Sequence, residues 1–352
     1  MKKNQARLYH TLGALVDEYI QSCEPVSSRI LNEKYLTDVS SATLRLDLLK
    51  LEEQNLISQP HVSAGRVPTI SGYRKYLAYI SPDHRNIIYD RMDTLRNLLI
   101  ENYKDTPRAL HYIMQVLAHE TDQLSFVAEP EVSNGYLSRL EVFSIGDSKL
   151  LFVMSLDSGL DKTVIMKCSY EINDAQLKKL VRYLNDELVG LRVYDIANKV
   201  LVEMRERVHG ESDLLSQFLV ELHKAFIEIS DFYIHYDGSI KFLEQPEFDS
   251  KEAILSFMNL IQRQDYILNA MCAHDESTVN VLMGEDFSDP RWHDFALIYS
   301  RYEVFGIPGY LGVLTPLRAE YRRLIPLMRD VSTTITQTTK RGMVVPRWRD
   351  SE

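Results

Sequence analysis

Residues 40–69 read SSATLRLDLLKLEEQNLISQPHVSAGRVPT, and this stretch decides the fold of the N-terminal part of the chain. In its first half, leucines recur at the spacing that places them on one face of a helix, namely Leu44, Leu48 and Leu51. A serine at the start of the stretch can cap this helix. We predict a helix over about 41–54 whose leucine face packs into a core, while Arg45 and Leu46 point outward.

The second half of the stretch predicts a β-hairpin. Two strand-like segments, Leu56–Gln59 and Val67–Thr69, flank a turn in which Gly65 can adopt a positive φ. Apolar spacing predicts further helices nearby, over about 5–21, 28–35 and 72–80, the last capped by Ser71. Three helices followed by a hairpin is the order of a winged helix-turn-helix, with the hairpin as the wing.

Composition predicts a multidomain globular protein with an uneven charge. The 352 residues are 45% hydrophobic and 26% charged, which is the usual balance of a folded chain. The net charge is −10, but residues 1–80 hold 10 Lys+Arg against 8 Asp+Glu, while the rest of the chain holds 30 against 42. Residues 54–82 contain no acid. An acid-free basic stretch on an acidic chain indicates where an anionic partner would bind.

Several classes of protein are excluded by pattern. No apolar run is long enough to span a membrane, and the N-terminus does not resemble a signal peptide. The three cysteines have no CxxC spacing, which disfavours a zinc ribbon and a disulfide framework and fits a reducing cytoplasm. His119-Glu120 lacks the second histidine of HExxH, residues 159–163 lack the glycines of a P-loop, and GxSxG is absent. We therefore expect that the protein is not an enzyme, that it holds no cofactor or metal, and that it has no membrane partner.

Beyond residue 80 the pattern mixes helices and strands. Helices are predicted over about 84–103, 107–124, 173–188, 198–230 in two pieces, 250–270 and 318–338, where Pro326 should introduce a kink. Strands are predicted over Gly135–Ser144, Lys149–Leu156, Thr163–Ser169, Thr278–Met283 and Tyr310–Leu314. Asp237-Gly238 predicts a hairpin between Phe232–Tyr236 and Ser239–Leu243.

The start of the 41–54 helix is the candidate DNA-reading element. Its small residues, Ser40 and Ser41 among them, would let the helix end enter a major groove. There Arg45 can donate two hydrogen bonds to guanine, Thr43 can bond a base edge or a phosphate, and Leu46 can contact a thymine methyl. In the wing, the candidates for a phosphate or the minor groove are His61, Ser63, the Gly65 amide and Arg66.

The same residues carry a resemblance to a known family. The motifs are Pro25-Val26-Ser27-Ser28-Arg29, Val39–Arg45, Gln59–Thr69, Gly72-Tyr73-Arg74, Asp157-Ser158-Gly159, Leu184-Asn185, Gln245–Phe248, Gly284-Glu285-Asp286 and Gly309–Arg318. In this order they resemble the HrcA family of bacterial heat-inducible transcription repressors over nearly the whole chain.

The resemblance implies an α+β multidomain fold: a winged helix followed by a GAF-like domain that an inserted dimerisation domain interrupts. The expected boundaries are 1–80 for the winged helix, 81–105 for a linker helix, 106–170 and 250–340 for the GAF-like domain, 171–249 for the insertion and 341–352 for a polar tail. It also implies a homodimer on an inverted-repeat, CIRCE-type operator of double-stranded DNA, and a GroEL-type chaperonin as partner. Further DNA contacts at the flanks would come from Arg29, Thr69, Tyr73 and Arg74.

Two departures from the family pattern bear on the operator. Val26-Ser27-Ser28 stands where the family usually has Val-Gly-Ser, and Leu46 stands where it usually has asparagine. An asparagine could read adenine, whereas leucine neither donates nor accepts a hydrogen bond.

Two other functions remain open from sequence. The GAF-like domain could sense a small ligand and regulate transcription, or the winged helix could bind a protein through Leu46 and Leu49.

Overall fold

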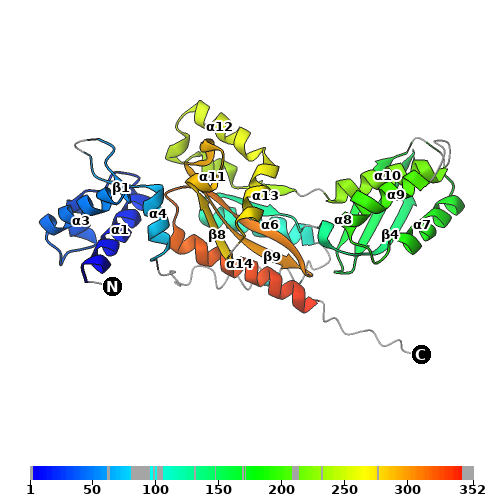
Figure 1. The fold of residues 1–352 in the computed structure, drawn as a ribbon, viewed down its shortest axis with the longest axis horizontal. Helices are drawn as coiled ribbons and strands as arrows, with labels where there is room; N and C mark the ends of the chain where they lie inside the picture. Colours follow the sequence, from blue (N-terminus) through cyan, green and yellow to red (C-terminus); the bar gives the residue numbers. More distant parts are fainter. Residues whose placement is uncertain are drawn as a thin grey trace.

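The computed structural model describes residues 3–61, 64–80, 96–97, 100, 106–130, 132–146, 148–168, 170, 172–207, 214–230, 233–275 and 277–342. These residues form three units in a row (Figure 1). We call them the N-terminal unit (residues 3–80), the core unit (106–130 and 233–342) and the insert (132–230). The expected α+β class is confirmed.

The N-terminal unit consists of helices and a two-stranded hairpin: α1 (Lys3–Ser22), α2 (Ser28–Lys34), α3 (Ser41–Glu53), β1 (Ile57–Ser58), β2 (Val67–Pro68) and α4 (Ile70–Leu77). The caps match the local chemistry, since the side chain of Ser27 accepts a hydrogen bond from the Ile30 amide and that of Ser40 accepts from the Thr43 amide. The expected cap at Ser71 is wrong. Thr69 caps α4, because the helix begins at Ile70, two residues earlier than expected.

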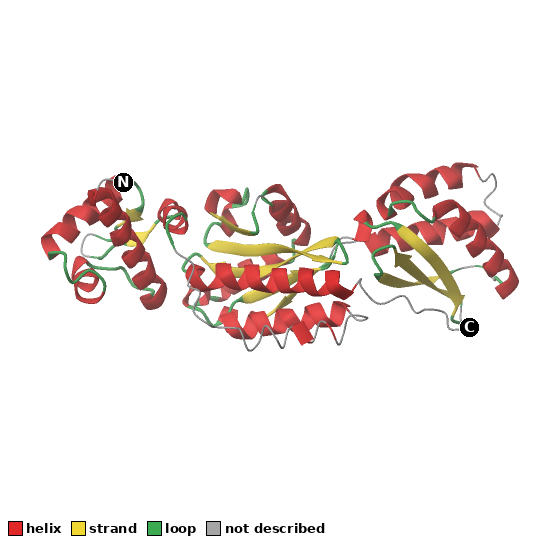
Figure 2. Cartoon of the chain, turned by 90° about the horizontal axis from the view of Figure 1, so that it is seen from below, coloured by secondary structure: helices red, strands yellow, loops and turns green. Residues whose placement is uncertain are grey.

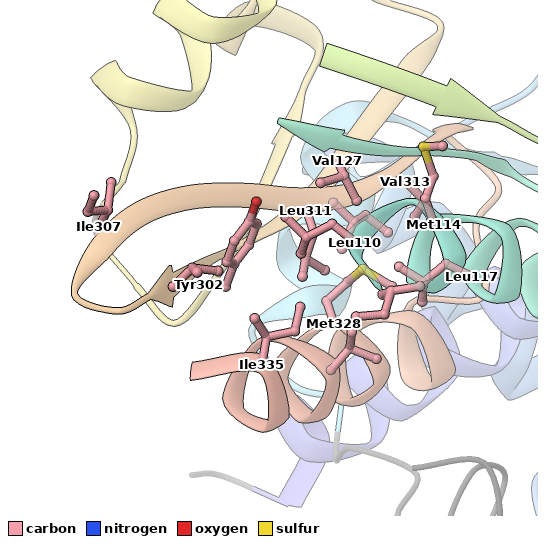
Figure 3. Close-up of a cluster of buried hydrophobic side chains, with 14 of the residues drawn as sticks. Leu110, Met114, Leu117, Val127, Tyr302, Ile307, Leu311, Val313, Met328 and Ile335 are labelled. Atoms are coloured by element: carbon pink, nitrogen blue, oxygen red, sulfur yellow. The ribbon is translucent and has the colours of Figure 1, made fainter. Parts of the chain in front are cut away.

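The core unit is a five-stranded antiparallel sheet covered by helices on both faces (Figure 2). Its strand order is β7 (Ile234–Asp237), β3 (Leu124–Ala128), β10 (Ile307–Pro316), β9 (Phe295–Val304) and β8 (Val279–Met283). One face packs against α6 (Thr106–Thr121) and α14 (Tyr321–Gly342), which bury the side chains drawn in Figure 3. The other face packs against α11 (Ser239–Leu243), α12 (Lys251–Ile261) and α13 (Gln264–Ala273).

The insert has its own three-stranded antiparallel sheet: β4 (Leu137–Ser144), β5 (Lys149–Leu156) and β6 (Asp161–Lys167). Its helices are α7 (Asp174–Leu188), α8 (Val193–Asp195), a π-helical turn (Ile196–Val200), α9 (Leu201–Arg207) and α10 (Leu214–Ser230). Helix α7 packs on β4, and α10 packs on β6. The buried side chains alternate along the central strand β5, as expected of a sheet with one covered face.

The insert begins earlier in the chain than the expected boundary at residue 171. Strands β4, β5 and β6 pair with one another and not with the five-stranded sheet, so they group with the helices that follow them rather than with residues 106–130. The physical reason is the pairing of β3 with β7. Next to this pair of strands, the Glu129 amide donates a hydrogen bond to the Tyr233 carbonyl at 3.1 Å. The chain between β3 and β7 therefore leaves the core unit and returns to it at the neighbouring strand.

Other differences come from tertiary pairing. Ser239–Leu243 is helix α11 and not the second strand of a hairpin. The helix buries the side chain of Phe242 against Phe248 and Phe257, in the core between the sheet and its covering helices. The helix expected over 250–270 is broken into α12 and α13. Strands β3 and β9 correspond to none of the predicted strands. The expected helix 84–103 and the tail 341–352 lie almost wholly outside the described residues.

Candidate nucleic-acid interface

Helix α3 buries its leucine face and exposes the predicted reading face. Leu44 and Leu51 are fully buried and Leu48 is 7% exposed, whereas Leu46 is 58% exposed and Arg45 is exposed beside it. Ser40 and Thr43 share a hydrogen bond between their hydroxyls at 2.8 Å, which orders the first turn. The predicted orientation of this helix is therefore confirmed.

A buried ion pair that the sequence pattern did not reveal ties α3 to α1. Asp47 is 1% exposed, and both of its carboxylate oxygens accept hydrogen bonds from Arg7, at 2.7 and 3.1 Å. Fork-to-carboxylate pairing of this kind fixes orientation as well as distance. The only sequence signal is the position of Asp47, which is three residues after Leu44 and four before Leu51 and so shares their face.

Gly65 holds the hairpin close to the α1–α2 connection. Val26 and Arg66 exchange two backbone hydrogen bonds at 2.9 and 2.8 Å. A Cβ on Gly65 would lie 2.5 Å from the carbonyl oxygen of Pro25, so only glycine fits. The expected positive φ is wrong here, because Gly65 is not among the residues with positive φ. Glycine is required by close approach instead.

The predicted wing cations differ in their surroundings. Arg66, in the hairpin, forms an ion pair with Glu52 of α3 at 3.0 Å, and its side chain is only 17% exposed. This ion pair links the hairpin to α3. Arg29 is exposed and pairs with Glu33 one turn along α2 at 2.8 Å. His61 is exposed in the loop. Ser63 lies outside the described residues.

Three of the predicted flanking residues are engaged by other parts of the fold. Thr69 caps α4 and donates to the Asn55 carbonyl at 2.6 Å. Tyr73 is 2% exposed and packs against Tyr321 of α14, with the two ring centroids 5.9 Å apart. Arg74 donates to the core unit, to the Met283 carbonyl at 3.1 Å and to Asp286 at 2.9 Å. In this arrangement Tyr73 cannot contact DNA, and Arg74 joins two units.

The contact between the N-terminal and core units is polar and aromatic. Arg322 of α14 donates to Asp17 of α1 at 3.1 and 3.2 Å, and the Tyr76 hydroxyl donates to the same carboxylate at 2.5 Å. Burial, with the Asp17 charge beside it, raises the pKa of Tyr76 well above its ordinary value. Tyr76 therefore stays a hydrogen-bond donor across the physiological range. These contacts orient α1, and with it the α3 that packs on α1.

Other kinds of site find no support in the described part of the chain. Its residues contain no group of three or more histidine, cysteine, aspartate or glutamate side chains arranged to hold a metal ion. None of the helices described has the length and apolarity required to cross a bilayer.

The model of the HrcA protein C-terminal domain matches residues 108–325. This chain belongs to the HrcA family. The chain is similar to a curated protein named heat-inducible transcription repressor HrcA from Natranaerobius thermophilus, with 29% identity over 92% of this chain and 94% of the relative. Relatives of the same name from Halalkalibacterium halodurans and Chlorobium phaeobacteroides are 27% and 29% identical, covering 93% and 90% of this chain and 95% and 93% of their own.

A solved structure supports the fold of this chain. A crystal structure described as a hypothetical protein superposes with a TM-score of 0.58 and 22% identity, covering 94% of this chain and 98% of the other. This likeness concerns the fold alone. The family itself is one of transcription repressors and not of enzymes.

Proposed function

We propose that this HrcA-family chain is a heat-inducible transcription repressor whose N-terminal unit is a winged helix that binds an inverted-repeat DNA operator. The observation that carries the proposal is the division of α3 into a buried leucine face and an exposed N-terminal end in a chain of this family. A reading helix needs this division, because its core face must be anchored while its other face enters the groove.

The chemistry of the exposed end suits a major groove. Free amides at a helix N-terminus favour phosphate, and Ser41 and Thr43 there can contact the backbone or a base edge. Arg45 can donate two hydrogen bonds to a guanine, and Leu46 can contact a thymine methyl. Because Arg66 is held by Glu52, we propose that it supports the wing and that His61 is nearer to the phosphates.

A mobility-shift assay tests DNA binding. The full-length protein should prefer an inverted-repeat duplex over the same duplex with one half-site scrambled, and log K should fall steeply with log salt. Arg45→Ala should relax sequence preference, while Lys50→Ala, at the far end of the same helix, serves as the matched control and should leave it unchanged. Equal binding to both duplexes by a folded preparation would contradict the proposal.

We propose that the insert joins two copies of the chain into a homodimer. Its sheet carries an apolar row on the face opposite the buried side chains, where Phe143 pairs with Leu151 and Leu151 pairs with Ile165. Phe143 is 48% exposed and Ile165 is 58% exposed. A row of this kind is typical of a surface that another protein covers.

Light scattering on a sizing column tests the dimer. Ile165→Glu should shift the mass from dimer to monomer, and Ile240→Glu should not, although Ile240 is equally apolar and even more exposed, on α11 of the core unit. A dimer that withstands Ile165→Glu and Phe143→Glu together would place the interface elsewhere.

We propose that the core unit is a GAF-like domain and that the chain depends on a GroEL-type chaperonin to reach its active state in the cytoplasm. The support is topological. Strand β3 pairs with β10, whose residues lie more than 180 positions further along the chain, and the whole insert lies between them. Such non-local pairing folds slowly and leaves apolar strands exposed meanwhile.

Heat would then lower the amount of active repressor, because unfolded proteins compete for the chaperonin. Refolding from denaturant with and without chaperonin tests this dependence. The yield of operator-binding protein should rise with chaperonin and fall when a denatured competitor is added. An equal yield in all three cases would contradict the proposal.

A further inference from the structure

Helix α4 lies at the boundary between the N-terminal unit and the core unit (Figure 1), and one of its faces fits a turn of the core unit. Ile70 and Arg74, four residues apart, form this face. A Cβ added to Gly284 would lie 2.6 Å from the Cδ1 atom of Ile70, so the two residues are in close contact. Arg74 donates hydrogen bonds to the Met283 carbonyl at 3.1 Å and to Asp286 at 2.9 Å. The turn at the end of β8 therefore holds one face of α4.

A second face of α4 packs against the start of α14. The ring centroids of Tyr73 and Tyr76 lie 5.9 and 6.4 Å from that of Tyr321, which is fully buried. The guanidinium of Arg322 lies 5.4 Å from the centre of the Tyr76 ring. It also donates to Asp17 of α1 at 3.1 and 3.2 Å. Two separate segments of the core unit therefore hold α4 on two of its faces.

Contact on two faces fixes the orientation of the reading helix. A helix that is held along one face can still roll about that line of contact, whereas a helix held along two faces cannot roll without breaking one of them. Helix α4 packs on α1, and α1 packs on α3. Because packed helices do not deform continuously, the orientation of α4 is passed on to α3. The N-terminal unit then moves with the core unit as one body.

We propose that Arg74 and Arg322 are positioning residues that fix the reading helix relative to the core unit and thereby set the half-site spacing that the repressor accepts. This inference rests on the proposed function, because only a dimer with two reading helices can measure spacing. One added base pair turns the second half-site by about 35° and moves it by about 3.4 Å along the DNA. A reading helix that is fixed to the core unit can follow this displacement only if one of the two contacts is released.

Two binding measurements separate a positioning role from direct contact with DNA. Affinity for a duplex with a single half-site depends on the residues that touch DNA. The dependence of affinity on the spacer between two half-sites depends instead on how the two reading helices are held. The guanidinium groups of Arg74 and Arg322 are engaged by carboxylates across the boundary between the units. Their loss should therefore change the dependence on the spacer and leave the affinity for a single half-site unchanged.

A mobility-shift assay on the full-length protein measures both properties, with one single-half-site duplex and a series of inverted repeats whose spacer changes by one base pair at a time. In the unmodified chain, one base pair away from the best spacer should weaken binding by about ten-fold or more, because a charge-assisted contact must be released. In the double variant Arg74→Gln, Arg322→Gln the same step should cost less than about three-fold.

The double variant Lys75→Gln, Arg323→Gln is the matched control. It removes the same two charges, one from each neighbouring position in the chain. The contacts of these two side chains stay within their own units, since the Lys75 ammonium lies 4.8 Å from the centre of the Tyr9 ring and Arg323 donates to the Glu120 carbonyl at 2.6 Å. The control should therefore keep the sharp dependence on the spacer.

A distance measurement without DNA tests the same contact independently of operator binding. Nitroxide labels are attached at Glu53→Cys on α3 and Leu255→Cys on α12, which are exposed positions, in a chain with Cys23→Ser and Cys272→Ser. Labelled chains are diluted with unlabelled ones, so that double electron–electron resonance reports distances within one chain. The distance distribution should be narrow in this background and in the control variant, and broader when Arg74→Gln and Arg322→Gln are added.

Three results would overturn the proposal. The first is a sharp dependence on the spacer that survives Arg74→Gln, Arg322→Gln, and the second is a distance distribution that stays as narrow in this variant as without it. The third is an affinity for the single half-site that falls further in this variant than in the control, because the arginines would then contact DNA. If the unmodified chain shows no preference for any inverted repeat, the proposed function and the claim about spacing both fail, and the label distances still decide whether the two arginines fix the N-terminal unit.

Discussion

Replacing Gly65 with alanine should detach the hairpin from the α1–α2 connection. The new Cβ would lie 2.5 Å from the Pro25 carbonyl oxygen and 2.5 Å from the Val26 carbonyl carbon, and both neighbours are backbone atoms that cannot rotate away. The hairpin must move outward by about 1 Å to restore van der Waals contact. That movement breaks the two hydrogen bonds between Val26 and Arg66.

The expected size follows from these contacts. Each of the two backbone hydrogen bonds contributes about 0.5–1.5 kcal/mol, so the local opening free energy should fall by about 1–3 kcal/mol. This corresponds to roughly five- to 150-fold faster hydrogen exchange at the amides of Val26 and Arg66. Operator affinity should fall as well, because the wing no longer holds its position beside α3.

Hydrogen exchange followed by mass spectrometry measures this effect peptide by peptide, so the other units do not obscure it. Gly13→Ala is the matched control, because a Cβ at Gly13 meets nothing within 4 Å and alanine favours the interior of α1. Its exchange should slow or stay the same. Equal exchange in Gly65→Ala and the unmodified chain would refute the argument from close approach.

Three further changes test other contacts. Leu44→Ala should lower the stability of the N-terminal unit by about 2–5 kcal/mol in urea unfolding because Leu44 is fully buried, whereas Leu49→Ala, at a 49% exposed site, should change it by less than about 0.5 kcal/mol. Asp17→Asn should speed hydrogen exchange in α4, because it weakens the bonds to Arg322 and Tyr76; unchanged exchange there would mean that the contact between the units does not depend on this carboxylate. Burial opposes ionisation of Glu129, but Lys162 and His235 outweigh it and hold the pKa of Glu129 below its ordinary value. The ionised Glu129 therefore stabilises the folded state at pH values above its ordinary pKa, and this contribution is lost as the pH falls through the lowered pKa. Glu129→Gln should therefore flatten the acid side of the urea midpoint measured against pH, and an unchanged profile would assign that dependence to other carboxylates.

The site divides into residues that local pattern predicts and residues that it does not. The exposed Arg45 and Leu46 follow from helical periodicity, which needs only neighbouring residues. Arg66 and Tyr73 look equally available in the sequence. Arg66 is engaged by Glu52 and Tyr73 by Tyr321, and neither partner is adjacent in the chain. A motif therefore identifies a candidate side chain, but it does not show whether that side chain already contacts another part of the fold.

By itself, the sequence determined the order of helices in the N-terminal unit, a serine cap at the start of α3, and which face of α3 is apolar, because these depend on contacts within a few residues. Only the tertiary structure decided that Ser239–Leu243 is helical and that β4–β6 belong to the insert. It also brought Tyr73 against α14. The pairing of β3 with β7 and β10, and the contact of Tyr73 with Tyr321, join segments more than a hundred residues apart. The free energy of those contacts outweighs the weak local preferences that the sequence displays.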